Sequence, residues 1–290
     1  AISVNVAQAS RGIELAHQFR SLGRTVILGG PHVSLVPELF EGKADSLVIG
    51  EFEPVAAEMA QDLAKGQPKS RYVGSQADLS QSPVPRWDLY QNDRAIAGVI
   101  QTSRGCPFEC NFCDVIQYLG RKQRHKPVEK VIEEAQVLYD HGYRLISLSD
   151  DNFTVNRRKS TELLKGLGEW NGRDGRDPVQ FSTQASIDLA RDPNLISLCN
   201  QAGLREIFVG IETSNEEALA EAGKRQNLRR DLVKDAEQIV SGGVSMLSGM
   251  MVGFDSDDLS CFEREFNFGM QLPIVNIRVT VLVAPLATPL

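Results

Sequence analysis

The sequence lacks the features of a disulfide-linked secreted protein and of a protein that crosses a membrane. Its five cysteines are an odd number, and three of them lie close together, at Cys106, Cys110 and Cys113. Such spacing favours metal binding over a disulfide framework. No apolar run is long enough to span a membrane, and no charged and then apolar leader stands at the start. We therefore expect a cytoplasmic protein without a membrane span.

Clustered positive charge is also scarce. The chain has 31 Lys and Arg against 38 Asp and Glu, a formal net charge of -7. Binding along nucleic-acid phosphates relies on clustered Lys and Arg, and the one prominent basic run is Arg121 to Lys126. This balance excludes a general nucleic-acid-binding surface. Arg124 in that run could instead approach a carboxylate of a small ligand.

The two ends of the sequence predict that the chain is a piece of a longer protein. Residue 1 is not Met, and Ile2 to Val6 resembles a buried strand with no turn before it. Residues 275–283 form a strand-like run that only two prolines and a few further residues follow. We expect further amino-terminal and carboxyl-terminal regions.

The first 65 residues alternate between strand-like and helix-like segments. Strands are predicted at 2–6, 25–28 and 46–49, and helices at 10–22 and 54–64. This alternation predicts part of a doubly wound α/β domain with a parallel sheet. Residues 66–94 are rich in Pro, Ser, Gln and Asp, which predicts a linker.

From residue 95 to 290 the alternation becomes regular and predicts a partial (β/α)6 barrel. Strands are expected near 98–102, 144–149, 179–184, 205–211, 245–253 and 275–283. Helices are expected near 127–141, 157–170, 192–202, 228–241 and 258–271. Functional residues of parallel barrels and open α/β sheets gather at the carboxyl ends of the strands.

The three clustered cysteines directly follow the first predicted barrel strand. A structural zinc site usually closes with four ligands, and no second Cys or His pair offers an obvious fourth. Iron–sulfur clusters use Cys thiolates, and a cubane held by three cysteines leaves one iron open to a substrate. Gly105 and Pro107 favour a fixed turn. The alternative is a structural metal site or a chance cluster of cysteines.

This Cys-x3-Cys-x2-Cys loop, with Phe112 before its last cysteine, resembles the defining motif of the radical SAM superfamily. The resemblance implies that Cys106, Cys110 and Cys113 are metal ligands and catalytic residues that hold a [4Fe-4S] cluster, with Phe112 beside it. It implies that the open iron binds S-adenosylmethionine (SAM), and that an electron from an external donor such as flavodoxin or ferredoxin releases a 5'-deoxyadenosyl radical.

Polar residues at the next two strand ends match places where this family binds SAM. Asp150, Asp151 and Asn152 would accept hydrogen bonds from the SAM amino group; alternatively, Asp151 or Asn152 caps the following helix. Gln184 and Ser186 could reach the SAM carboxylate or ribose, or serve only in a turn.

The fourth and fifth strands end in further family-like segments. Gly210 would allow close approach and Glu212 would bind the ribose hydroxyls, the alternative being that Glu212 caps the helix that begins near Asn215. Gly249, Met251 and Gly253 resemble the segment that flanks adenine, although Ser256 stands where the family usually has Glu. The two remaining cysteines, Cys199 and Cys261, are predicted to be core thiols.

The amino-terminal part resembles the last strands of a cobalamin-binding domain. Gly29, Gly30 and Gly50 would let the backbone approach a nucleotide-like tail. The lower-ligand motif Asp-x-His-x-x-Gly is absent from this sequence. His32 could be offered as a cobalt ligand, but after Gly-Gly-Pro we interpret it as a loop residue.

Asp150 to Phe153 and the carboxyl-terminal segment are similar to the subgroup that contains hopanoid and bacteriochlorophyll methylases, although Ala284, Leu286 and Ala287 depart from it. The resemblance implies a cobalamin-dependent methyltransferase that acts on an unactivated carbon of a lipid or tetrapyrrole-like substrate. Two alternatives are a radical SAM oxidative cyclase or rearranging enzyme without methyl transfer, and a non-catalytic iron–sulfur electron-transfer or sensing module.

Overall fold

The fold is described from a computed structural model of the chain, which covers residues 1–173, 175–274 and 276–290. The chain forms two compact units. Unit 1 comprises Ala1–Asp78, Cys113–Gly120 and Ala284–Leu290, and unit 2 comprises Leu79–Phe112 and Arg121–Val283. Each unit is built around its own sheet.

Unit 1 contains a four-stranded parallel sheet with the strand order β1-β2-β3-β4. The strands are β1 (Ile2–Ser3), β2 (Ile27–Gly29), β3 (Ser46–Gly50) and β4 (Arg71–Gly74). The helices are α1 (Ala9–Ser21), α2 (Pro31–Leu35), α3 (Ala56–Ala64) and α4 (Val115–Tyr118).

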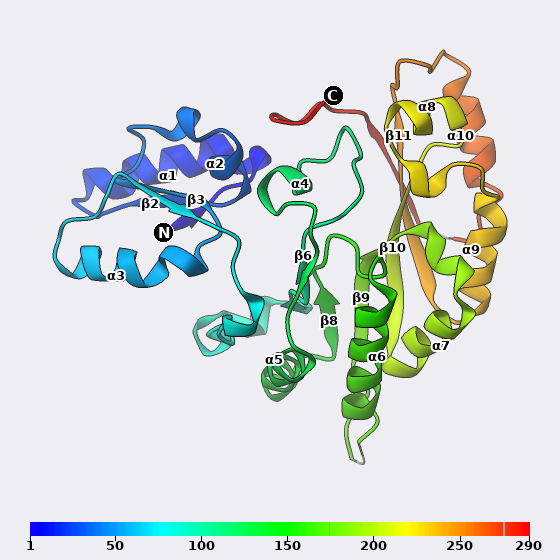
Figure 1. Cartoon of the computed structure of the whole chain (residues 1–290), viewed down its shortest axis with the longest axis horizontal. Coiled ribbons are helices and arrows are strands. Elements are labelled where there is room, and N and C mark those ends of the chain that lie inside the picture. Colours follow the sequence, from blue (N-terminus) through cyan, green and yellow to red (C-terminus); the bar gives the residue numbers. More distant parts are fainter. Residues whose placement is uncertain (174, 275) are drawn as a thin grey trace. The chain divides into compact units, whose positions relative to one another are not determined.

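The sheet of unit 1 is covered on both faces, because its central strands are apolar on both sides. Leu28 packs with Ala16 of α1 and Val33 of α2 in one buried cluster. Val48 packs with Met59 of α3 in a second cluster. In Figure 1, α1 and α2 accordingly lie on one side of these strands and α3 on the other. The predicted doubly wound arrangement is confirmed.

Two elements of unit 1 differ from the sequence-based prediction. The predicted linker at 66–94 contains β4, which pairs with β3 from Leu47 opposite Arg71 to Gly50 opposite Gly74. Within β4 only Tyr72 is buried, so the strand lacks the apolar pattern that the prediction relied on. Residues after Gly30 form α2 rather than a loop, with Pro31 at its first position.

Unit 2 contains a six-stranded sheet in which all pairs are parallel, with the order β12-β11-β10-β9-β8-β5. Its strands are β5 (Gly98–Ile100), β8 (Leu145–Leu148), β9 (Gln180–Ala185), β10 (Leu204–Glu212), β11 (Ser245–Val252) and β12 (Ile277–Val281). Each strand lies beside the next one along the chain, as in a partial (β/α)6 barrel. This architecture is confirmed, although Val275 of the predicted last strand lies outside the described residues.

Helices connect successive strands of this sheet. They are α5 (Val128–Asp140), α6 (Arg157–Asn171), α7 (Pro193–Ala202), α8 (Glu216–Glu221), α9 (Leu232–Ser241) and α10 (Cys261–Gly269). Buried apolar side chains such as Leu138 of α5, Leu167 of α6 and Ile239 of α9 pack against strand residues such as Phe181 in one core. Figure 1 shows α6, α7 and α9 along the same side of the sheet. Because all strand pairs of this sheet are parallel, the carboxyl ends of the strands lie at one edge of the sheet.

Unit 2 also contains a short helix that begins near Asn215, where the sequence indicated one, and a ribbon that was not predicted. The short helix α8 precedes α9 between β10 and β11. A two-stranded antiparallel ribbon pairs β6 (Ser103–Arg104) with β7 (Arg124–His125). In the part of the chain that the structure describes, no helix is long and apolar enough to cross a membrane.

Candidate functional site

The cysteine loop (residues 105–113) begins at the carboxyl edge of the six-stranded sheet. Strand β5 ends at Ile100, and the ribbon strand β6 leads directly into the loop. Ser103 pairs with His125 in this ribbon. The loop therefore leaves the edge at which parallel α/β folds place their ligands.

The carboxylate of Asp150 holds the segment that leads into the loop. Asp150 follows β8 and is almost completely buried. Its Oδ1 accepts from the backbone N–H groups of Thr102 at 2.8 Å and Ser103 at 2.6 Å, and its Oδ2 accepts from the Thr102 hydroxyl. Burial raises the pKa of Asp150 to about 6, while these hydrogen bonds oppose that rise. Both carboxylate oxygens are thus used by the fold.

The neighbouring residues continue this support. Asp151 Oδ2 accepts from the N–H of Gly105 at 3.0 Å, at the first residue of the loop. The buried amide of Asn152 donates to the Ser186 hydroxyl at 2.6 Å, which brings two predicted site residues together. Gln184, by contrast, has an exposed side chain. Asn156 rather than Asp151 or Asn152 caps α6, so the capping alternative for those two residues is wrong.

The three clustered thiols are not in disulfides. Cys110 is buried, whereas Cys106 and Cys113 are half-buried. Burial raises the pKa of the Cys106 thiol, and a hydrogen bond from the backbone of Phe108 opposes the rise. Three thiols on one loop are the donor set that an iron–sulfur cluster uses.

Among residues 1–173, 175–274 and 276–290, no three His, Cys, Asp or Glu side chains are grouped so that they could hold a metal ion. Cysteine thiols are the ligands that iron–sulfur clusters use, so the residue types of the loop fit a cluster. In this structure the three thiols are not gathered around one point. The other two cysteines are buried. Cys199 lies in the main core, where burial raises its pKa to about 12, and both are core thiols as predicted.

A segment that the sequence did not reveal, residues 221–227, contacts the middle of the cysteine loop. The N–H of Asn111 donates to the Ala222 carbonyl at 3.0 Å, and the Asn111 amide donates to the Glu221 carbonyl at 2.9 Å. Phe112 packs against an apolar cluster that includes Ala218 and Ala222. These contacts fix the loop from the side of α8.

The same segment reaches the end of β10. Lys224 Nζ lies 2.6 Å from Glu212 Oε1, and both side chains are largely buried. Asn227 donates to the carbonyls of Gly210 at 3.0 Å and Ile211 at 2.9 Å. A side chain at Gly210 would collide with the Glu212 carboxylate. Glu212, the predicted ribose ligand, is thus paired with Lys224 in this structure.

The capping alternative for Glu212 is wrong, because Asn215 caps α8 by accepting from the N–H of Glu217. A second acid at this strand end, Glu265 of α10, was not predicted. It is buried and accepts from the Thr213 hydroxyl at 2.8 Å and the Ser214 N–H at 2.9 Å. Glu265 is 52 residues further along the chain than Thr213, so no local sequence pattern links the two residues.

The end of β11 contains the predicted adenine-flanking residues. Gly249 lies against the ring of Phe208. A side-chain carbon added to Gly249 would lie 2.8 Å from the Phe208 Cζ atom. Met251 is half-buried and Gly253 is exposed. Asp257 accepts from the N–H groups of Gly253 and Phe254, so this carboxylate, rather than Ser256, fixes the turn.

In unit 1 the predicted cobalamin-contacting glycines have local packing reasons. Gly30 has a φ of +100°, and a side chain there would lie 2.7 Å from the Val4 nitrogen. Gly50 has a φ of +79° and lies against the carbonyl of Gly74, while Gly29 packs on Val48. His32 is buried in α2 against Phe40. The local backbone therefore requires glycine at positions 30 and 50.

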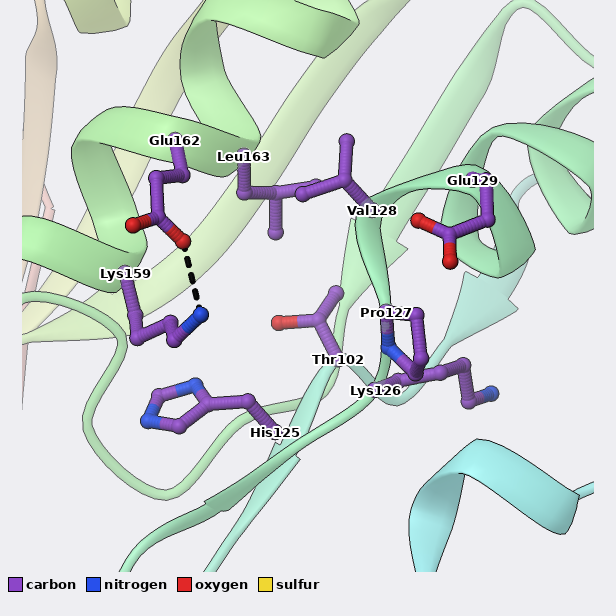
Figure 2. Close-up of a pocket in the computed structure, with 9 residues that line it drawn as sticks. All are labelled: Thr102, His125, Lys126, Pro127, Val128, Glu129, Lys159, Glu162 and Leu163. Carbon is purple, nitrogen blue, oxygen red and sulfur yellow. Dashed lines mark hydrogen bonds and ion pairs between the residues drawn. The ribbon is translucent and has the colours of Figure 1, made fainter.

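A pocket of about 450 Å³ lies next to the ribbon (Figure 2). His125 and Lys159 line it together with Glu162, which accepts from Lys159 at 2.7 Å. Burial, with the nearby Lys159 charge, lowers the pKa of His125. Thr102, which donates to Asp150, also lines this pocket. None of the clustered cysteines lines this pocket.

Comparison with known proteins places this site in a family. The model of the radical SAM superfamily matches residues 100–268, more than half of the chain. An uncharacterized methyltransferase of Synechocystis sp. is 33% identical over 98% of this chain and 53% of its own length. The hopanoid C-2 methylase of Rhodopseudomonas palustris is 32% identical over 91% of this chain and 51% of its own length.

The chain thus spans about half the length of these curated relatives. Among solved structures, the radical S-adenosylmethionine methyltransferase TsrM from Kitasatospora setae, solved with cobalamin and a [4Fe-4S] cluster, aligns with a TM-score of 0.80 at 19% identity. The alignment covers 97% of this chain and 62% of TsrM, so both units have counterparts in that fold. The predicted family is confirmed: the chain belongs to the radical SAM superfamily.

Proposed function

We propose that the chain is the core of a radical SAM methyltransferase in which Cys106, Cys110 and Cys113 hold a [4Fe-4S] cluster. When bound, the cluster supplies the electron that cleaves SAM to methionine and a 5'-deoxyadenosyl radical, and cobalamin supplies the methyl group. The observation that carries the proposal is the cysteine loop, which starts at the carboxyl edge of the six-stranded sheet inside the matched family region.

The residues around the loop have a defined part in this proposal. Asp150 and Asp151 hold the backbone at Thr102, Ser103 and Gly105, which fixes the direction in which the loop leaves the sheet. The half-buried Phe112 covers the loop on the side of α8 and limits the access of water to the sulfurs. Cluster assembly is expected to draw the three thiols together, since each must contribute one thiolate.

SAM binding is assigned to the strand ends around this edge. Glu212 would exchange part of its pairing with Lys224 for the ribose hydroxyls, and Gly210, Gly249 and Gly253 leave backbone accessible to the nucleoside. Asn152, Gln184 and Ser186 supply polar groups for the methionine moiety. Asp150 acts through the backbone that it holds, because its oxygens already accept three hydrogen bonds.

Unit 1 is proposed to bind cobalamin. Its Gly30 and Gly50 lie at the carboxyl ends of β2 and β3, the edge of a doubly wound sheet at which ligands bind. The proposal extends to a lipid or tetrapyrrole-like substrate, by likeness to the hopanoid methylase, and to an external donor such as flavodoxin or ferredoxin. Cysteines that are not in disulfides suit a reducing compartment such as the cytoplasm.

The first test is anaerobic reconstitution of the chain with iron and sulfide, followed by electron paramagnetic resonance (EPR) with and without SAM. We expect a reduced [4Fe-4S] signal that changes when SAM is added and that Cys110→Ala abolishes. Cys199→Ala, which removes a core thiol, is the matched control and should retain the signal. A cluster signal that SAM leaves unchanged would instead favour an electron-transfer module.

Cobalamin is tested separately, by adding hydroxocobalamin to the reconstituted chain and measuring retained corrinoid absorbance after gel filtration. Retention in stoichiometric amount supports methyl transfer. A full-length protein that forms a SAM-responsive cluster and retains no corrinoid would favour the cyclase or rearranging alternative.

A further inference from the structure

The side-chain amide of Gln226 faces the sulfur of Cys110. Its Nε2 lies 3.9 Å from the Cys110 Sγ, within the range of an N–H···S hydrogen bond. Cys110 is the most buried of the three clustered cysteines. The two residues are 116 positions apart, so the fold alone brings them together.

The orientation of this amide suits a thiolate rather than a thiol. A thiolate has no proton to donate, so only the NH2 side of an amide can form a hydrogen bond with it. The other end of the side chain, Gln226 Oε1, is buried without a hydrogen-bond partner. Among the described residues, the Cys110 sulfur is therefore the one polar group that the Gln226 amide contacts.

The backbone around Gln226 is fixed independently of this contact. Gly223 has a φ of +65° and lies so close to the cysteine loop that an added side-chain carbon would be 2.7 Å from the Glu109 carbonyl. Asn227, the next residue after Gln226, is buried and donates to two carbonyls of β10. The amide is thus presented to the sulfur by a rigid segment.

We propose that Gln226 is a positioning residue that raises the reduction potential of the cluster by donating an N–H to the Cys110 sulfur. The inference rests on the proposed function, in which Cys110 is a cluster ligand. Reduction adds negative charge to the cluster, and a hydrogen-bond donor at a ligand sulfur stabilises that charge. Such contacts are among the main determinants of iron–sulfur potentials.

The test is a potentiometric titration of the reconstituted chain, followed by EPR, for the unaltered chain, Gln226→Leu and Gln201→Leu. Gln201 is an exposed residue of α7 whose side-chain amide donates to the Ser197 hydroxyl, so Gln201→Leu is the matched control. We expect Gln226→Leu to shift the reduction equilibrium toward the oxidised cluster by up to about tenfold, or about 59 mV for one electron. Gln201→Leu should leave the potential unchanged.

A second readout separates hydrogen bonding from folding. In deuterated buffer, pulsed EPR should detect an exchangeable deuteron close to the cluster, and Gln226→Leu should remove that coupling. Gln226→Met keeps the length of the side chain and has no exchangeable proton, so it should lose the coupling even if leucine at this position unfolds the chain.

The outcomes distinguish the inference from the proposed function. An unaltered chain that forms no SAM-responsive cluster contradicts the proposed function. If the unaltered chain forms such a cluster, while Gln226→Leu and Gln226→Met keep both its potential and its deuteron coupling, the inference is overturned and the function stands.

Discussion

The start and the middle of the cysteine loop are held by different chemistry. At the start, one buried carboxylate, Asp150, accepts from two backbone N–H groups and a hydroxyl. In the middle, the 221–227 segment offers backbone carbonyls, a neutral amide and a compensated ion pair. With Asp151, which accepts from the N–H of Gly105, the start therefore depends on the ionisation of acids, whereas the middle depends on close packing and on a charge that is already balanced.

The largest expected effect concerns the compensated pair in the middle region. Lys224→Met leaves the buried Glu212 carboxylate without its counter-charge, which typically costs about 3–5 kcal/mol of unfolding free energy. Adding Glu212→Gln should recover part of the loss, because it removes the uncompensated charge. Lys234→Met, at an exposed pair with Asp231, is the control for chemical denaturation. Equal loss in both lysine variants would show that the pair is not effectively buried.

The next effect is a pH dependence confined to the start of the loop. Since the pKa of Asp150 is about 6 rather than 3.8, the folded chain keeps a proton that the unfolded chain loses between these values. The stability from this group is complete below about pH 4 and declines until about pH 6. At 1.36 kcal/mol per unit, the decline is on the order of 3 kcal/mol.

This decline is measured as the difference in unfolding free energy between the unaltered chain and Asp150→Asn, across about pH 4 to 8. Asp177→Asn, at a mostly exposed carboxylate, controls for the removal of one acid. Parallel pH profiles for all three proteins would contradict the assignment of the decline to Asp150.

A smaller effect is expected at the turn of the 221–227 segment. Gly223→Ala places a side chain in the left-handed region, at about 1–2 kcal/mol, and also against the Glu109 carbonyl. Gly66→Ala has a similar backbone cost, since its φ is +70°, but open space around it, since nothing lies within 4 Å of that position. The difference between the two melting temperatures therefore reports the close approach to the cysteine loop. No difference would mean that the loop yields without cost.

The smallest effect is expected at Asn111. Asn111→Ala removes the hydrogen bond to the Glu221 carbonyl, at about 1 kcal/mol for a neutral pair. Asn267→Ala, at an exposed position of α10, is the control in the same denaturation series. If Asn111→Ala lowered the unfolding free energy as much as Lys224→Met does, the neutral hydrogen bonds would stabilise the middle of the loop as strongly as the buried ion pair. That result would contradict the comparison.

Sequence reasoning predicted the six-stranded sheet well because strands such as β10 and β11 carry regularly spaced apolar residues and because helices separate the strands of this sheet along the chain. It also located the cysteine loop, because metal ligands must be particular residue types at fixed spacing. It missed β4, which buries only Tyr72, and the ribbon of β6 and β7, whose strands are two residues long each. Short elements of this kind are decided by neighbours rather than by their own pattern.

The roles of individual polar residues were harder to predict. Asp150 was expected to face SAM, yet it accepts from the backbone at Thr102 and Ser103, and a carboxylate suits either task. The 221–227 segment gave no signal, because its contacts use carbonyls and a neutral amide. Such groups occur in every loop, and only the three-dimensional arrangement distinguishes these.

The ribbon of β6 and β7 also governs how the chain tolerates changes in length. By pairing Ser103 with His125 and Arg104 with Arg124, it joins the two ends of the intervening segment, residues 105–123. The entropic cost of closing such a loop rises by only about 0.6 kcal/mol for each doubling of its length. Insertions after Cys113 would therefore lengthen this closed loop at little cost in folding free energy. The ribbon would still hold the part of the loop that contains Cys106 and Cys110 at the sheet edge.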